Sequence, residues 1–85
     1  MIKVKGEGKV TIDPELNKFR TTAYLTVNYN RSYEIMLEAN ELQPYLQFKS
    51  LRKKSIIMFE GELTESRTEP GYPIIEVHKV KVIKR

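Results

Sequence analysis

The sequence predicts a mainly β fold, a closed barrel of five strands with one helix between the third and fourth strands. Five segments alternate apolar and polar residues, and a separate segment between the third and the fourth repeats its apolar residues at helical spacing. Glycines interrupt two of the predicted strands, at Gly6 and Gly8 and again at Gly61. Glycine inside a strand marks a bulge, a bend or a close backbone approach. Because a short sheet closes into a barrel only where its strands bend, these glycines favour a barrel.

The composition limits the chain to one small domain, residues 1–85, and predicts no metal and no cofactor. Eighty-five residues leave no room for a second hydrophobic core. The chain has no cysteine, which excludes disulfides and thiolate metal sites, and one histidine, His78, does not make a histidine-rich site. Charged residues at 31% beside hydrophobic residues at 40% are typical of a folded, highly charged protein.

The charge and the hydropathy pattern predict a soluble, cytoplasmic protein with a mild preference for polyanions. The net charge is +4 and the pI is about 9.4. No apolar run approaches the ~20 residues that cross a bilayer. The first five residues alternate like a strand and lack the apolar core of a signal peptide.

Three strands are predicted in the first half of the chain. The first, at residues 2–12, has a buried parity made of Ile2, Val4, Val10 and Ile12. A turn at 13–14 and a polar connection at 15–19 follow. The second strand, at 21–29, turns inward Ala23, Leu25 and Val27 and outward Tyr24, Thr26 and Asn28. After a short turn at 28–32, the third strand, at 33–39, turns inward Ile35, Leu37 and Ala39 and outward Glu34, Met36 and Glu38.

A helix and two further strands are predicted in the second half. Within 40–54 an apolar stripe at helical spacing consists of Leu42, Tyr45, Leu46, Phe48 and Leu51. Because proline is tolerated in the first turn of a helix, the regular helix is expected to begin at about Pro44. The fourth strand covers 55–63 and is followed by a polar hairpin loop at 64–71. The last strand covers 73–83, and a change of apolar phase near His78 and Lys79 predicts a bulge.

This order of elements is that of the OB-fold, a five-stranded Greek-key barrel with one helix. The chain also resembles the bacterial single-stranded DNA-binding proteins and the related primosomal replication protein n. The resemblance spans nearly all 85 residues and rests on the glycine strand with its Asp-Pro-Glu turn at 6–16, Ala-Tyr-Leu-Thr-Val at 23–27, the helix, basic turn and Glu-Gly-x-Leu strand at 46–63, and Ile-Glu-Val at 75–77.

The resemblance implies single-stranded DNA binding in replication, restart or recombination, by a homodimer or homotetramer that contacts other replication proteins. The sequence departs from the family in three ways. The loop between the second and third strands is short, tryptophan is absent, and the last residues are basic where the DNA-binding proteins carry an acidic tail that ends in phenylalanine. The missing acidic tail favours a primosomal or pared-down replication protein.

Candidate binding residues are the flat and cationic side chains expected near the outer face of the second and third strands and the adjoining loops. Single strands are bound by stacking of bases on aromatic rings and by cations that contact phosphates. The predicted site contains Arg20, Tyr24, Tyr29, Arg31, Tyr33, Lys53, Lys54, Arg67 and Tyr72. Tyrosine is also common on strands without a ligand, and Tyr33 shares the inward parity of Ile35, so a structural role remains an alternative for these rings.

The charge pattern contains one contradiction and two ambiguous clusters. Glu34 and Glu38 are expected to face outward in the predicted groove, where like charge opposes phosphate. The run Lys49, Arg52, Lys53 and Lys54 serves either phosphate binding or the dipole at the helix C-terminus. Outward basic residues on the first and last strands either contact phosphate or protect an exposed sheet edge. They are Lys3, Lys5, Lys9, Lys79, Lys81, Lys84 and Arg85.

Catalysis has little support in the sequence, and we expect a binding protein and not an enzyme. Carboxylates recur at Asp13 and Glu15 and at Glu60 and Glu62, but acid–base chemistry needs a pocket that tunes their pKa. The chain has no phosphate-binding loop and no nucleophile elbow. Two alternatives to single-stranded DNA binding remain, an RNA-binding OB protein and an OB domain that serves as a protein-binding assembly subunit.

Overall fold

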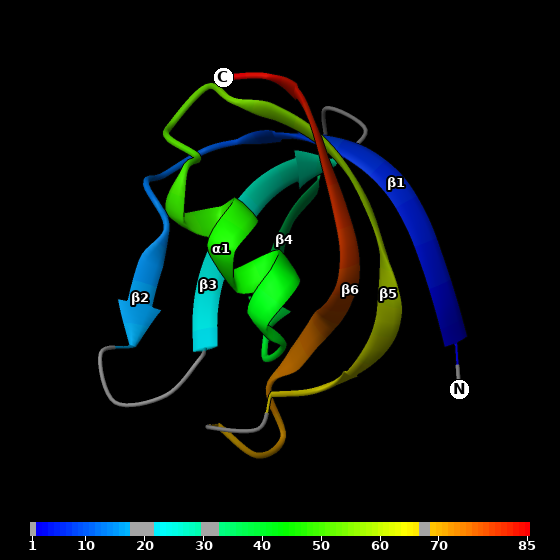
Figure 1. Ribbon diagram of the computed structural model, residues 1–85. Helices are drawn as coiled ribbons and strands as arrows, with labels where there is room; N and C mark the ends of the chain where they lie inside the picture. The colour runs from blue at the N-terminus through cyan, green and yellow to red at the C-terminus, as the bar shows by residue number, and fades with distance from the viewer. Residues whose placement is uncertain (1, 18–21, 30–32, 67–68) are drawn as a thin grey trace.

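The computed structural model describes residues 2–17, 22–29, 33–66 and 69–85 (Figure 1). Its elements, in chain order, are β1 (Ile2–Val10), β2 (Glu15–Asn17), β3 (Thr22–Tyr29), β4 (Tyr33–Ala39), α1 (Leu42–Lys49), β5 (Ile56–Glu65) and β6 (Pro73–Lys84). Among these residues no helix is long and apolar enough to cross a membrane.

The sheet closes on itself as a barrel. The strands are hydrogen-bonded in the order β1-β5-β6-β4-β3, and β3 pairs again with β1. All of these pairs are antiparallel except β4 with β6, which is parallel. Five strands, β1, β3, β4, β5 and β6, therefore make the closed barrel. In chain order, α1 follows the third of them and precedes the fourth (Figure 1). The predicted OB-fold is confirmed.

The barrel closes where β1 changes partner. Residues 2–9 of β1 pair with β5, while residues 8–10 pair with the end of β3. Gly8 therefore faces Ile57 on one side and Tyr29 on the other. A methyl group at Gly8 would lie 2.9 Å from the side chain of Val27, so the strand crosses this seam only with glycine there. The prediction that the first strand bends at its glycines is explained by this crossing.

The connection predicted at 15–19 contains a strand that sequence reasoning missed. Residues Glu15–Asn17 form β2, which pairs with residues 22–24 of β3. β1 occupies the same edge of β3 further along, at residues 27–29. β2 thus resumes the pairing of β1 after the interruption at 11–14, where Thr11 donates to the Thr26 carbonyl oxygen at 2.9 Å. Three residues with one apolar member carry too weak an alternation to predict a strand.

The helix is shorter and less buried than its apolar stripe predicts. It spans Leu42–Lys49, so Pro44 lies in the first turn, as expected for this residue. Phe48 and, just beyond the helix, Leu51 are buried in the barrel core, whereas Leu42 and Leu46 are exposed. Two turns of helix present only part of the stripe to the barrel, and the remainder faces away from it.

The core is formed by the inward parity of the strands together with Phe48 and Leu51. Its members match the inward residues predicted on the second and third strands, and the strands contribute Val10, Ala23, Leu25, Val27, Leu37, Ala39, Ile57, Phe59, Ile75, Val77 and Val80. The predicted bulge on the last strand is confirmed, because Gly61 pairs with Val77 and Glu60 with Lys79, which leaves His78 as the extra residue. A second register shift lies between Ile56 and Ile57.

Gly61 permits the closest approach of β5 to β6. A Cβ atom at this position would lie 2.1 Å from the carbonyl oxygen of Glu76 and 2.8 Å from its carbonyl carbon. Backbone atoms cannot turn aside as a flexible side chain can. The glycine that the sequence singled out is therefore required by contact between neighbouring strands at the bulge.

Replacing Gly61 by Ala should destabilise the fold by about 1–3 kcal/mol or more, because the added methyl group forces β5 and β6 apart. Gly71→Ala is the matched control, since Gly71 has a φ of 87° and no atom within 4 Å of the added Cβ. The control should cost about 1–2 kcal/mol through its left-handed backbone alone. Urea unfolding measures both, and a smaller loss for Gly61→Ala than for Gly71→Ala would contradict the steric argument.

Candidate nucleic-acid interface

The outer face of β3 and β4 carries three cross-strand pairs. Tyr24 lies opposite Glu38, Thr26 opposite Met36, and Asn28 opposite Glu34. This is the alternation predicted from the sequence. Tyr24 is half-buried, as a ring lying on a sheet surface would be, and Met36 beside it is also half-buried. The middle of this face is therefore a mixed aromatic and aliphatic surface.

Among the site tyrosines whose side chains the structure describes, Tyr33 and Tyr72 are exposed. Tyr33 is 66% exposed and Tyr72 is 45% exposed. Tyr33 shares its parity with Ile35, but it is the first residue of β4, beyond the inward residues that form the core. Burial in the core, the alternative for Tyr33, is therefore wrong. Tyr29 pairs with Tyr33 through the backbone.

The predicted tyrosines do not form one compact platform. The Tyr29–Tyr33 pair and Tyr24 are five residues apart along β3, which is about 17 Å in an extended strand. Tyr72 lies just before β6, after the loop that follows β5. A ligand that touched all of them would have to be extended along the sheet. Arg20, Arg31 and Arg67, the three arginines of the predicted site, lie outside the described residues.

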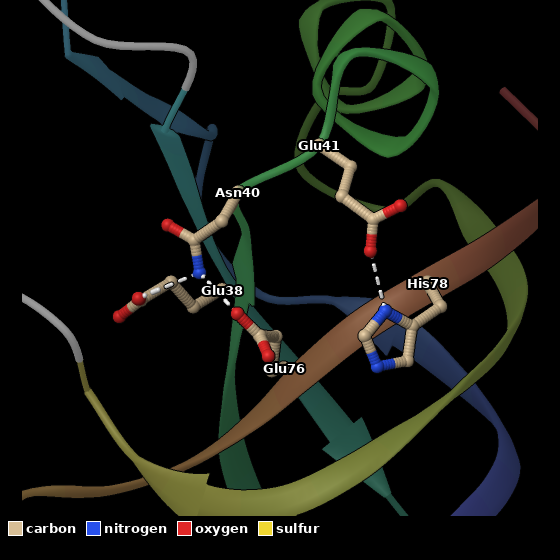
Figure 2. A network of polar contacts seen from close by, with 5 residues as sticks. All are labelled: Glu38, Asn40, Glu41, Glu76 and His78. Atoms are coloured by element: carbon tan, nitrogen blue, oxygen red, sulfur yellow. Dashed lines mark hydrogen bonds and ion pairs between the residues drawn. The ribbon is translucent and has the colours of Figure 1, made fainter.

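Glu38 does not face the groove as the parity argument expected. Its side chain is fully buried, at 0% exposure. The Asn40 side-chain amide donates to Glu38 Oε1 at 2.9 Å (Figure 2). The Ser66 hydroxyl donates to Glu38 Oε2 at 2.6 Å. The carboxylate points out of the barrel, as predicted, but the chain around Ser66 covers it. Of the two glutamates that were expected to oppose phosphate in the groove, Glu38 is therefore not accessible to a ligand.

The same network links β4 to β6. The Asn40 side-chain nitrogen also donates to Glu76 Oε2 at 2.8 Å (Figure 2). The Thr22 hydroxyl donates to Asn40 Oδ1 at 3.2 Å. Glu38 and Glu76 are direct partners in the parallel pair of strands. One amide thus bridges two neighbouring carboxylates, which lowers their mutual repulsion at the only parallel pairing among the described strands.

An acidic row runs round the outside of the barrel through Tyr24. Following the register from strand to strand, the row contains Glu15, Tyr24, Glu38, Glu76, Glu62 and Lys3. Phosphate would be disfavoured along this row. Towards the other end of the barrel, the corresponding row contains Glu34, Asn28, Lys9, Ile56 and Lys84 and has only one carboxylate.

Lys53 and Lys54 belong to a turn that is fastened to the end of β1. The Lys54 amide donates to the Val10 carbonyl oxygen at 2.8 Å, and the Lys53 amide donates to Asp13 Oδ1 at 2.8 Å. Lys54 adopts a φ of 81°, and the side chains of Arg52, Lys53 and Lys54 are all exposed. Because α1 ends at Lys49, the interpretation that this whole run complements the helix dipole is wrong; only Lys49 lies in the last turn.

Two of the four carboxylates that were considered for catalysis, Asp13 and Glu60, have structural contacts. Asp13 accepts the Lys53 amide, and Glu60 lies 3.3 Å from Lys5 Nζ. His78 Nδ1 lies 2.6 Å from Glu41 Oε1, so the bulge of β6 contacts the start of α1 (Figure 2). Within the described part of the chain, no group of three or more His, Cys, Asp or Glu residues could hold a metal ion.

Asn28 is a candidate that sequence reasoning placed on the outer face and did not select. Among the described side chains, its Oδ1 is the only buried polar atom without a hydrogen-bond partner. It lies between Lys9 and Glu34, at the edge of the tyrosine-bearing face. The amide could pair with a polar ligand group there. Its outward parity was visible in the sequence, but only the structure shows that its oxygen has no partner.

Comparison with known proteins supports the architecture. No family model matches the chain, and no curated protein matches it. The chain superimposes on part of asparaginyl-tRNA synthetase from Pyrococcus horikoshii with a TM-score of 0.76 and 19% identity, covering 96% of this chain and 20% of the synthetase. This likeness, at 19% identity, shows the fold alone. The chain spans about a fifth of the synthetase.

A second similar structure is matched along nearly its whole length. It is the small single-stranded DNA-binding protein from Streptomyces coelicolor, with a TM-score of 0.69 and 13% identity. The match covers 99% of this chain and 92% of the other. The two proteins therefore share one domain of similar size and architecture, and the family resemblance inferred from the sequence stays a prediction.

Ser66→Ala should lower the free energy of unfolding by about 1.5–3 kcal/mol, because it takes a hydrogen bond from the buried carboxylate of Glu38. Ser50→Ala is a matched control, since the exposed Ser50 hydroxyl donates only to the Gln47 carbonyl oxygen of the helix end. Its expected loss is well under 1 kcal/mol. Urea unfolding of both variants tests this, and equal losses would show that the Glu38 network does not stabilise the fold.

Proposed function

We propose that this protein binds single-stranded DNA with little sequence preference, in DNA replication, restart or recombination. The observation that carries the proposal is the pair of rings on β3 and β4 of an OB barrel: half-buried Tyr24 lies on the outer face, and 66%-exposed Tyr33 lies at the start of β4, beyond the core. Base–aromatic stacking tolerates any sequence, because every base has a flat face. The likeness to a whole single-stranded DNA-binding protein supports the same conclusion.

In this proposal the phosphates lie near Lys9, Lys53 and Lys54, at the end of the β3–β4 face where β1 meets β3. Tyr33 pairs with Tyr29, and Tyr29 pairs with Gly8, one residue from Lys9. The turn that carries Lys53 and Lys54 is bonded to Val10 on the same end of β1. Burial of Glu38 removes one of the two negative charges that opposed this path. Glu34 stays exposed and is the remaining unfavourable group.

We further propose a non-enzymatic role in the cytoplasm, as a homodimer or homotetramer that contacts replication proteins such as those of the primosome. One barrel of this size contacts few nucleotides, and oligomers extend the bound length.

RNA binding is the second candidate, and the likeness to part of an asparaginyl-tRNA synthetase favours it. RNA and DNA single strands are separated by local contacts to the 2′-hydroxyl, which neither fold nor charge predicts. The third alternative, a protein-binding assembly subunit, loses support, since the acidic third strand that favoured it has Glu38 buried within the fold.

Titration of fluorescein-labelled oligo-dT of ~35 nucleotides at two salt concentrations tests the proposal. With about four phosphates contacted, the log–log salt slope should be near −3. Duplex DNA of the same length should fail to compete, and poly-dT should compete better than poly-U. Better competition by poly-U would favour the RNA candidate. Absence of oligo-dT binding at low salt would exclude single-stranded DNA binding and leave RNA and protein partners to be tested.

Tyr33→Ala should weaken binding of oligo-dT by about 1–3 kcal/mol if the ring stacks on a base. Because Tyr33 is exposed, the variant should unfold at nearly the same urea concentration as the wild type. Tyr33→Phe keeps the ring and should retain affinity, while Leu46→Ala, on the exposed side of α1, should leave it unchanged. Unchanged affinity in Tyr33→Ala would remove this ring from the site.

A further inference from the structure

A groove walled by lysines runs along β5 on the outer face of β1, β5 and β6. Two adjoining hollows of about 370 and 700 Å³ form it, and they share Lys5, Glu60, His78 and Lys79. Lys3 extends the groove at one end and Lys81 at the other. None of these lysines was selected for the predicted site. We call this surface the lysine groove.

The register explains the two lysine walls. Lys5 on β1 and Lys79 on β6 both lie opposite Glu60 of β5, and Lys81 lies opposite Met58. Side chains on one face of a strand recur about every 7 Å, and strands two apart are separated by about 10 Å. Lys5 and Lys79 therefore face each other across β5, and Lys81 extends the β6 wall, whereas the β1 residue opposite Met58 is Glu7. The β6 wall is the side of the groove on which successive cations suit an extended phosphate chain.

The floor of the groove, on β5, combines Met58 with the carboxylates of Glu60 and Glu62. Met58 is 38% exposed, and Gly61 presents no side chain. Glu60 lies within ion-pair distance of Lys5, at 3.3 Å, so part of its negative charge is compensated. Lys3, Lys79 and Lys81 have exposed side chains. A sugar or base could cover the floor while cations on both sides approach the phosphates.

The lysine groove adjoins the tyrosine face across β1. Following the outer surface from β3 over Lys9 to β5 leads from Asn28 to Ile56 and then to Lys84. The opposite route, from β4 to β6, crosses the acidic row at Glu38 and Glu76. A polyanion leaving the tyrosine face is therefore favoured to pass over β1. A second copy of this chain is disfavoured as the occupant, since it would bring lysine against lysine.

We propose that the lysine groove is a second phosphate-binding track, on which a single strand continues after leaving the tyrosine face. The proposal rests on the single-strand binding proposed above. It assigns phosphate contacts to Lys79 and Lys81, which lie beyond the acidic row, with Lys9 at the crossing. A strand long enough to reach both surfaces would therefore release more counterions than a short one.

The test compares salt slopes for Lys79→Gln/Lys81→Gln with those of the wild type. The probes are labelled oligo-dT of about 8 nucleotides, within the site of one OB fold, and of about 30 nucleotides. Loss of two phosphate contacts should reduce the log–log slope by about 1.4 with the long probe and leave the short probe unaffected. Lys79→Arg/Lys81→Arg should restore the slope, and Lys49→Glu, which lowers the net charge by the same amount in the last turn of α1, should not change it.

The outcomes separate this inference from the proposed function. If the wild type binds the long probe and the groove variant keeps its slope, the track does not exist, and an acidic protein segment becomes the fitting ligand. An equal slope change in the Lys49→Glu control would attribute the effect to net charge and also overturn the track. A wild type that binds neither probe would overturn the proposed function itself. Urea unfolding of each variant verifies that its fold is intact.

Discussion

The structure depends on one constraint, the need for β1 to pair with two strands at once. Before Gly8, β1 pairs with β5 alone. From Gly8 onward it also pairs with the end of β3, and this second pairing closes the sheet into a barrel. A side chain at Gly8 would meet Val27, which belongs to the core. Closure, core packing and the neighbourhood of Lys9 and the tyrosine face therefore follow from the same seam.

A second close contact, at the other end of the sheet, shapes the lysine groove. Gly61 lets β5 approach the Glu76 carbonyl group, and the accompanying bulge makes His78 the extra residue of β6. After that bulge, the outward parity of β6 passes to Lys79 and Lys81. The irregularity that eases the curvature of the barrel is thus also what aligns the cations of β6 with those of β1.

The charge of the molecule is distributed by register more than by composition. A net charge of +4 indicates only a mild preference for polyanions. Folding places glutamates from four strands in one row with Tyr24, and brings lysines from β1 and β6 to either side of β5. The acidic row limits where a phosphate chain can run, because like charges repel most where water is partly excluded. The two surfaces together favour an extended ligand and a route over Lys9.

Local periodicity in the sequence predicts the chain order of the five barrel strands, the position of the helix, the inward residues of β3 and β4, and the bulge at His78. It does not predict the short strand β2. The tertiary structure decided the rest. Alternation shows that Glu38 leaves the barrel interior, but only folding shows that Ser66 and Asn40 cover it. The helical stripe predicts burial of Leu46, yet a two-turn helix buries only one side. Likewise, Lys5 and Lys79 are 74 residues apart in sequence, and only their common partner Glu60 makes them neighbours.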